Sequence, residues 1–122
     1  MGRYVLAEDY VRAQRGREAL QREVDAALAA ADALILPTLP IPSPSLGQAS
    51  VLFGDVEMPV RAVMLRLTQL FNITGHPAIS LPCGVTTAGL PVGLQLVGRR
   101  HQTLSLLHLA LTCEGLLHSG LN

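Results

Sequence analysis

The spacing of apolar and polar positions predicts three helices. From residue 4 to residue 31, apolar side chains recur at helical spacing with arginines and acidic residues between them, which is typical of an amphipathic helix. The same spacing returns in residues 59–71 and 102–118 and predicts two further helices. Gly16 weakens the first helix by about 1 kcal/mol relative to alanine, so a bend or a break at that position is an alternative.

Three short apolar runs lie between and after the helical segments and are typical of strands. They are ALILP at 33–37, AISLP at 78–82 and PVGLQLVG at 91–98. The glycine- and threonine-rich residues 83–89 predict an antiparallel hairpin between the second and third runs. A helix connects the first run to the second, which predicts that these two strands are parallel, with a right-handed connection. The expected fold is α/β, a small mixed sheet of about three strands with about three helices.

The last two strands belong to a long uncharged stretch, because no charged residue lies between Arg66 and Arg99. A membrane span is one alternative at this length, but three prolines and five glycines within residues 75–98 interrupt any apolar helix of about 20 residues. Strands buried on both faces are the simpler interpretation. The side chains expected in the core are Ile79, Leu81, Leu94 and Leu96. Three helices are too few to cover both faces, so we expect a surface that requires further cover.

The segment of about residues 37–58 is expected to be a proline-rich loop. Five prolines lie at positions 37, 40, 42, 44 and 59, and proline removes a backbone donor and holds its predecessor extended. By composition alone the segment could be a linker. Because no charge occurs from residue 33 to residue 54, an extended loop lying on a surface is the preferred interpretation.

Composition sets further limits on fold and partners. The chain has 122 residues, typical of a single domain spanning 1–122, and aromatic residues make up only 3%. Nine arginines balance nine acidic residues, so we expect neither nucleic acid nor a membrane as a partner. Two cysteines, Cys83 and Cys113, match neither a zinc site nor a disulfide scaffold, which favours a reduced, cytoplasmic setting. We expect no cofactor and no metal.

Two self-contained hydrolytic sites are conceivable from the residues alone. One combines Ser80, His76 and Asp55, and the other pairs Cys83 with His76. Ser80 lies inside a predicted strand without the Gly-x-Ser-x-Gly turn that exposes a nucleophile, and buried cysteines are usually unreactive. The remaining histidines are spaced by seven and ten residues, which does not bring two metal ligands together on a helix. We therefore expect no catalytic residue in this chain.

Four ordered segments resemble a known family. DALILPTLPIPSP, TQLFNITGHPAISLPCG, GLPVGLQLVGRR and LLHLALTCEGLL are similar, in this order, to the C-terminal portion of amidase-signature enzymes. That family includes bacterial amidases, indoleacetamide hydrolases, fatty-acid amide hydrolase and the A subunit of the glutamyl-tRNA amidotransferase. The resemblance implies one large α/β domain with a mixed central sheet, of which this chain would be about the last quarter.

The resemblance also implies that this chain is inactive alone. Family members hydrolyse amides with a serine nucleophile, a second serine held by a cis peptide and a lysine that accepts a proton, all in N-terminal parts of the family pattern. The sequence contains no lysine and no Ser-Ser pair. Arginine cannot replace the lysine, because its guanidinium does not become neutral near pH 7.

The C-terminal portion of the family helps to shape the acyl pocket. Carried over by motif, the pocket candidates are Pro37, Thr38, Thr68, Asn72 and Gly75. Each also has a structural interpretation as a chain-breaking, capping, turn or helix-surface residue. Amidotransferase relatives carry an acidic residue at the position of Leu65, and this departure favours a general amidase ancestry.

Two classes of function remain open at this point. The chain is either the C-terminal segment of an amide hydrolase, or a non-catalytic binding or self-association module derived from one. The expected partners are therefore further copies of the chain, as a homodimer or higher oligomer, or a chain that carries the N-terminal amidase portion. An upstream sequence that contains the two serines and the lysine would favour the first class.

Overall fold

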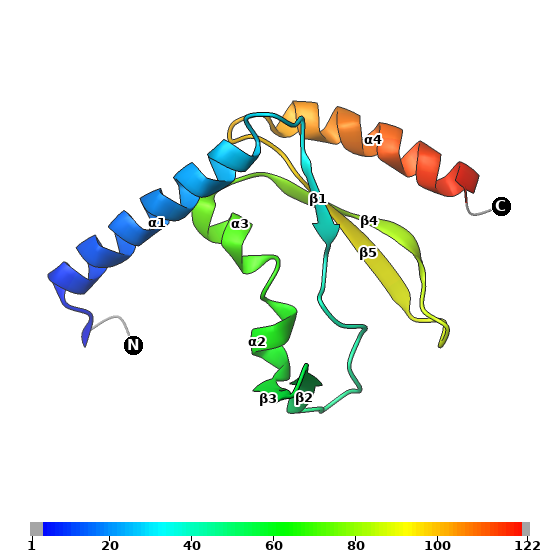
Figure 1. The fold of residues 1–122 in the computed structure, drawn as a ribbon, viewed down its shortest axis with the longest axis horizontal. Helices are drawn as coiled ribbons and strands as arrows, with labels where there is room; N and C mark the ends of the chain where they lie inside the picture. Colours follow the sequence, from blue (N-terminus) through cyan, green and yellow to red (C-terminus); the bar gives the residue numbers. More distant parts are fainter. Residues whose placement is uncertain (1–3, 121–122) are drawn as a thin grey trace.

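The computed structural model describes residues 4–120 (Figure 1) and confirms the α/β class with a three-stranded sheet. A second, two-stranded sheet accompanies it. The elements in chain order are α1 (Ala7–Ala27), β1 (Leu34–Pro37), β2 (Ser50–Phe53), β3 (Val56–Pro59), α2 (Val60–Met64), α3 (Gln69–Thr74), β4 (Ala78–Val85), β5 (Pro91–Val97) and α4 (Thr103–Gly120).

The main sheet has the strand order β1-β5-β4, and both neighbouring pairs are antiparallel. The predicted β4–β5 hairpin is confirmed, with Leu81 opposite Leu94. The prediction that β1 and β4 are parallel is confirmed, and β5 lies between them. The connecting helix constrains the direction of the two strands and leaves room for a later strand to insert between them.

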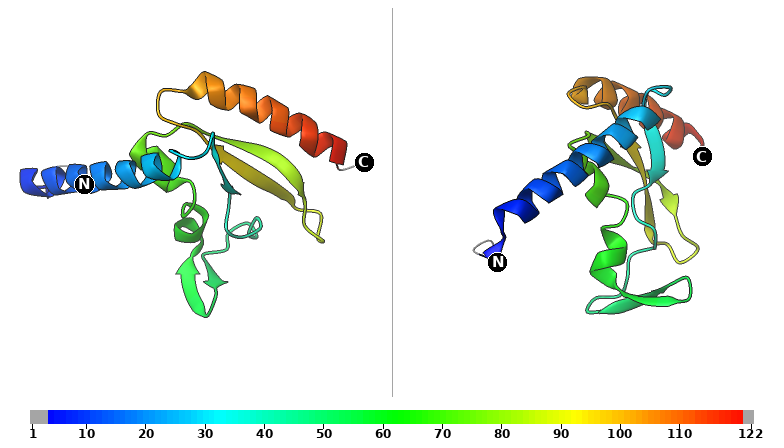
Figure 2. Two further views of the ribbon diagram at one scale, coloured as in Figure 1. Left: turned by 45° about the horizontal axis from the view of Figure 1, so that its top comes forward. Right: turned by 60° about the vertical axis from the view of Figure 1, so that its left-hand side comes forward.

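The two faces of the sheet are covered by different helices (Figure 2). α4 packs on one face, where Leu81 and Leu96 contact Leu106 and Ala110. The C-terminal end of α1 and α3 cover part of the other face, around Val97. Leu81 and Leu96 are buried as predicted, whereas Ile79 and Leu94 are only half-buried, because α4 does not extend over the whole face.

α1 is continuous through Gly16, so the alternative of a break does not occur. Glu8 and Asp9 lie in its first turn, where a negative charge is favourable. At its other end, the Arg99 guanidinium donates hydrogen bonds to the carbonyls of Leu28 at 3.2 Å and Ala31 at 3.1 Å. The Arg99 cation, just after β5, thus binds carbonyls at and beyond the C-terminal end of α1, where a positive charge is favourable. The N-terminal half of α1 projects away from the sheet (Figure 1).

The predicted helix over residues 59–71 is wrong in its continuity, because two short helices, α2 and α3, take its place. Helical spacing of apolar residues persists across the break, so periodicity does not reveal it. The break leaves the Leu67 carbonyl free to accept a hydrogen bond from the buried Gln95 amide at 3.3 Å. Gly75 ends α3 with a φ of 74°, as the predicted stop signal requires. No helix within residues 4–120 is long and apolar enough to cross a bilayer.

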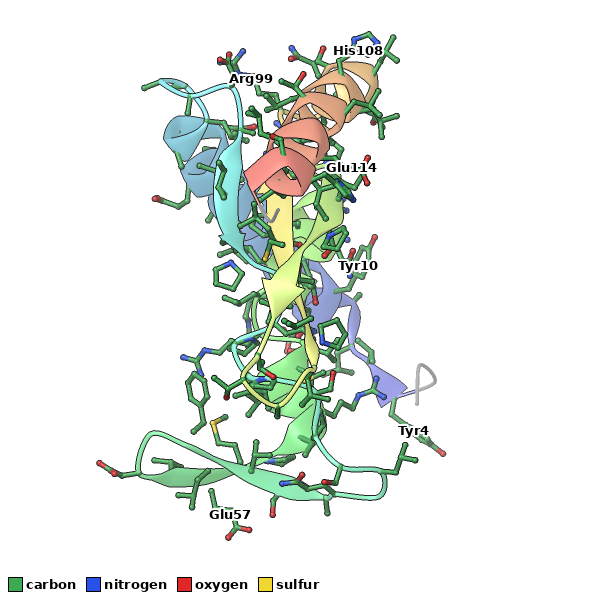
Figure 3. The ribbon with its side chains drawn as sticks, turned by 90° about the vertical axis from the view of Figure 1, so that its right-hand side faces the viewer. Tyr4, Tyr10, Glu57, Arg99, His108 and Glu114 are labelled. Atoms are coloured by element: carbon green, nitrogen blue, oxygen red, sulfur yellow. The ribbon has the colours of Figure 1, made fainter. Side chains whose placement is uncertain are left out.

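The proline-rich region contains regular structure that was not predicted, since β2 and β3 form a hairpin at residues 50–59. Gly54, with a φ of 62°, and Asp55 form its two-residue turn. The hairpin contacts α2, and Arg66 lies 5.2 Å above the Phe53 ring. Figure 3 shows it, with Glu57, at the opposite end of the molecule from α4.

Candidate functional site

The first two candidates, Pro37 and Thr38, lie where β1 ends beside the central strand. The Thr38 backbone N–H donates to the Gly93 carbonyl at 2.8 Å. The hydroxyls of Thr38 and Ser80 are 2.5 Å apart, across the same part of β5. Both side chains lie on the face opposite α4, where the helices leave this end of the sheet uncovered. The site therefore presents two hydroxyls on an open sheet surface.

Gly93 makes this pairing of hydroxyls possible. A Cβ atom at position 93 would lie 2.7 Å from the Ser80 Oγ and 2.8 Å from the Thr38 Oγ1. Side chains do not approach that closely, so any other residue would push the hydroxyls apart. Sequence reasoning named Thr38 but not its partnership with Ser80, because the two residues are 42 positions apart and no local pattern links them.

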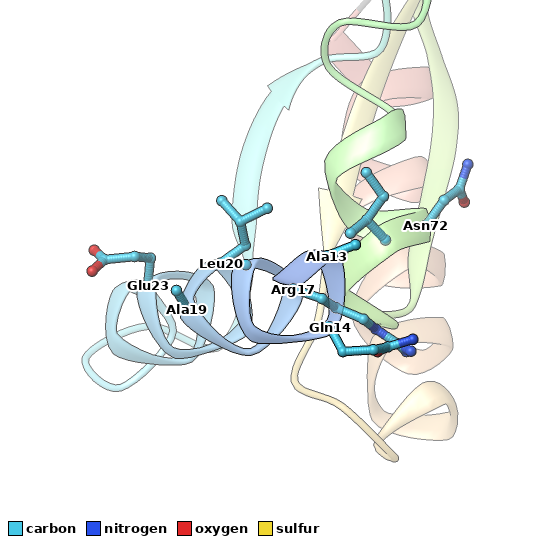
Figure 4. A pocket seen from close by; sticks show the side chains of 9 residues that line it. Ala13, Gln14, Arg17, Ala19, Leu20, Glu23 and Asn72 are labelled. Atoms are coloured by element: carbon cyan, nitrogen blue, oxygen red, sulfur yellow. The ribbon is translucent and has the colours of Figure 1, made fainter. Parts of the chain in front are cut away.

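The other three candidates lie on or beside α3. Thr68 occupies the position before the helix and makes no side-chain capping bond. Asn72 is exposed and lies at the rim of a groove between α3 and α1 (Figure 4), and Gly75 forms the left-handed end of the helix. Within residues 4–120, no side-chain hydrogen bond links two of the five candidates, so they form two groups, one on the sheet and one on α3.

A buried histidine connects three parts of the fold that are distant in sequence. The His76 side chain is 0% exposed; its Nε2 lies 3.1 Å from an Asp25 carboxylate oxygen and its Nδ1 lies 2.9 Å from the Thr74 hydroxyl. Arg100 donates to the other Asp25 oxygen at 2.7 Å. The network ties α1 to the α3–β4 turn and to the β5–α4 connection, and the sequence analysis did not find it.

The same network sets the protonation state of Asp25. The hydrogen bond from Arg100 lowers the pKa of Asp25 below its ordinary value, and the bond with His76 acts in the same direction. Partial burial opposes this shift and raises the pKa, but the hydrogen bonds outweigh it. Asp25 is therefore a carboxylate at neutral pH, held between a guanidinium and an imidazole.

Neither of the self-contained hydrolytic sites is assembled. Both ring nitrogens of His76 are engaged by Asp25 and Thr74, while Ser80 pairs with Thr38. Asp55 lies in the hairpin turn, and the Cys83 thiol donates to the Val92 carbonyl. In the part of the chain that the structure describes, no group of three or more metal-ligating side chains comes together.

Comparison with known proteins defines the class to which this fold and site belong. The family model named Amidase matches residues 1–107, so the chain belongs to the amidase family. A crystal structure of an amidase superimposes on 88% of this chain with a TM-score of 0.80 and 37% identity, and the matched region is 25% of that protein.

Two curated relatives show how much of such a protein this chain represents. It is 39% identical over 106 residues to the A subunit of the glutamyl-tRNA(Gln) amidotransferase from Myxococcus xanthus (strain DK1622), a match that covers 86% of this chain and 21% of that protein. It is 37% identical over 108 residues to the fatty acid amide hydrolase of Oryza sativa subsp. indica, a match that covers 88% of this chain and 18% of that protein. The chain spans about a fifth of the length of these relatives.

Proposed function

We propose that this chain is the C-terminal segment of an amidase-signature amide hydrolase, that it is inactive alone, and that it contributes fold and part of the acyl pocket when joined to the rest of the enzyme. The observation that carries the proposal is the match to the amidase family over residues 1–107 in a chain that spans about a fifth of its relatives. The family's lysine and serine pair have no counterpart in this sequence.

The surface area of the chain supports the same proposal. A compact monomer of 13.0 kDa is expected to expose about 6,300 Å². This chain exposes 8823 Å². The excess, about 2,500 Å² by that scaling, is as large as one side of an extensive obligate interface. A segment of a larger domain has such a surface because its neighbouring elements are absent.

The first test is amide hydrolysis by the purified chain alone. We expect no turnover of simple aryl or alkyl amides, because losing the catalytic groups of a hydrolase removes several orders of magnitude of rate. The Ser80→Ala and Cys83→Ala variants serve as controls for the two alternative nucleophiles. Steady hydrolysis by homogeneous protein that either substitution abolishes would contradict the proposal.

The pocket assignment requires the rest of an amidase around the chain. We define the chimera as the crystallised amidase in which this chain replaces the matched quarter, and the completing portion as the remaining three quarters. If Thr38 and Asn72 contact the acyl group, Thr38→Val and Asn72→Ala should change the ratio of kcat/KM between a small and a large acyl substrate by about tenfold. A purely structural role would lower both values equally. Glu57→Gln, on the distant hairpin, is the matched control.

A second candidate function is a non-catalytic module that self-associates. The observation in its favour is the row of exposed leucines on α4, Leu104, Leu107 and Leu111, together with the uncovered sheet surface. Two-fold pairing is the commonest symmetric solution for such a surface. Light scattering at micromolar concentration, combined with the chimera, separates the two functions: a discrete dimer and a chimera that folds but does not hydrolyse amides would favour the module.

A further inference from the structure

The N-terminal two thirds of α1, residues 7–20, form an arm that receives almost no cover from the rest of the chain. Val24 is the one residue of α1 that is buried, whereas Tyr10, Val11 and Leu20 are exposed. An isolated helix of this length is marginal in water. Figure 2 shows the arm extending beyond the sheet and α4 in both views. The arm therefore gains little stability from packing within this chain.

A groove runs between this arm and α3. It has a volume of about 880 Å³ and is lined in part by the apolar side chains of Ala13, Leu20 and Ile73. Arg17, Glu23 and Asn72 contribute polar groups to the lining. Figure 4 shows Ala13 and Leu20 on one side of α1, with Asn72 at the edge of α3. The groove is shallow, open to solvent and largely apolar, with charged margins, as expected of a surface that receives another segment of protein.

Gly16 lies in this groove and leaves it open. A Cβ atom at position 16 would meet no atom of this chain within 4 Å. In a helix interior, glycine costs stability relative to other residues, and this chain gains no packing of its own from it. A surface that approaches closely from outside would use the space that the absent side chain leaves.

We propose that the groove between α1 and α3 is the docking surface for the completing portion of the amidase, and that an apolar segment of that portion fills it along α1, with Asn72 left at the rim. This rests on the proposed function. Part of α1 belongs to the fold shared with the crystallised amidase, because the 12% of this chain outside the match is shorter than the 21-residue helix. The excess surface of about 2,500 Å² exceeds the roughly 800 Å² per partner of a standard-size interface and matches one side of an extensive obligate interface, such as the interior of a larger domain provides.

The test compares two leucine substitutions on the same helix. Gly16→Leu fills the groove, and Glu18→Leu places the same side chain on the opposite face of α1. In the chain alone, Gly16→Leu should leave the thermal midpoint unchanged or raise it, because the new side chain enters open space and glycine is the poorer helix former. In the chimera, Gly16→Leu should lower the midpoint by several degrees, while Glu18→Leu should leave it unchanged.

Three results would overturn the docking proposal. The Gly16→Leu chimera could be as stable as the parent chimera, or both leucine variants could destabilise it equally. Gly16→Leu could also convert a dimer of the chain alone into a monomer, which would identify a second copy as the occupant. Because the readout is stability, a chimera that folds but lacks hydrolysis would refute the proposed function and leave this comparison intact.

A second measurement applies if the parent chimera does not fold. The chain and the completing portion are then coexpressed as separate polypeptides, and the yield of the completing portion that copurifies with the tagged chain is measured. We expect Gly16→Leu to reduce that yield at least tenfold and Glu18→Leu to leave it unchanged. Equal yields for both variants, or no copurification with the parent chain, would contradict docking at the groove.

Discussion

Two regions of this molecule differ in how far the rest of the chain covers their apolar side chains. Where β1, β5 and β4 run side by side, near Leu34, Val97 and Ala78, α4 packs on one face and α1 with α3 on the other. The N-terminal arm of α1 and the β2–β3 hairpin lie outside this double-sided core. The first region is packed on both faces within this chain, and the second has large apolar side chains that the chain leaves exposed.

The largest contrast should come from removing one leucine in each region. Leu96 is 0% exposed in the core and Leu52 is 73% exposed on the hairpin. Leu96→Ala should lower the free energy of unfolding by about 2–5 kcal/mol, whereas Leu52→Ala should change it by less than about 0.5 kcal/mol. Urea denaturation followed by circular dichroism measures both. Equal losses would show that the hairpin is as well packed as the sheet.

A smaller effect is expected at Gly93 in β5, where the absence of a side chain leaves room for the Thr38 and Ser80 hydroxyls. Gly93→Ala should cost about 1–3 kcal/mol, because the added methyl group would overlap the Ser80 and Thr38 hydroxyls. Adding Ser80→Ala removes one of the two clashes and should recover part of the loss. A Gly93→Ala variant that is as stable as the parent would show that the hydroxyls move apart freely.

The Asp25–Arg100 pair gives a pH-dependent contribution that anchors α1 to the core. The Arg100 hydrogen bond lowers the folded-state pKa of Asp25 below its ordinary value of 3.8. The pair therefore stabilises the fold at pH values above the ordinary pKa of Asp25, and this contribution is lost as the pH falls through the folded-state pKa. Asp25→Asn and Arg100→Gln should each be less stable than the parent at pH 7, with the difference shrinking toward acid pH. A difference that is independent of pH would exclude this linkage.

The smallest free energy is expected for local opening of the N-terminal arm of α1, which native-state hydrogen exchange measures. Amides of α1 before Leu20 should exchange with little protection, since few tertiary contacts hold this part of the helix closed. Amides of β5 between Gln95 and Val97 should exchange through global unfolding. In the chimera, the α1 amides should become protected. Strong protection of the arm in the chain alone would mean that it is covered, for example by self-association.

The sequence predicted elements well where the signals were local. Residues 83–89, rich in glycine and threonine, indicated the β4–β5 hairpin, although the strand continues past Cys83 to Val85. The β2–β3 hairpin was missed even though Gly54 and Asp55 form a recognisable two-residue turn, because the surrounding prolines favoured an irregular loop. The break between α2 and α3 was missed because apolar spacing continues through it.

Features that depend on distant residues could not be predicted. The position of β5 between β1 and β4 depends on which strand edges meet in space, and strand direction alone does not determine that. The network of Asp25, His76 and Arg100 joins residues that are 51 and 75 positions apart, and each of them taken alone resembles an ordinary charged or turn residue. Thr38 and Asn72 were named through the family resemblance, and their acyl-pocket role remains a prediction.

The central claim is that this chain supplies one part of an amide hydrolase whose catalytic groups lie elsewhere. The rate of amide hydrolysis by the chimera tests it most directly, with the completing portion alone and this chain alone as controls. We expect hydrolysis by the chimera and none by either control, because the fold and the acyl pocket are complete only when both parts are present. A folded chimera that hydrolyses no amide, or hydrolysis by the completing portion without this chain, would contradict the account.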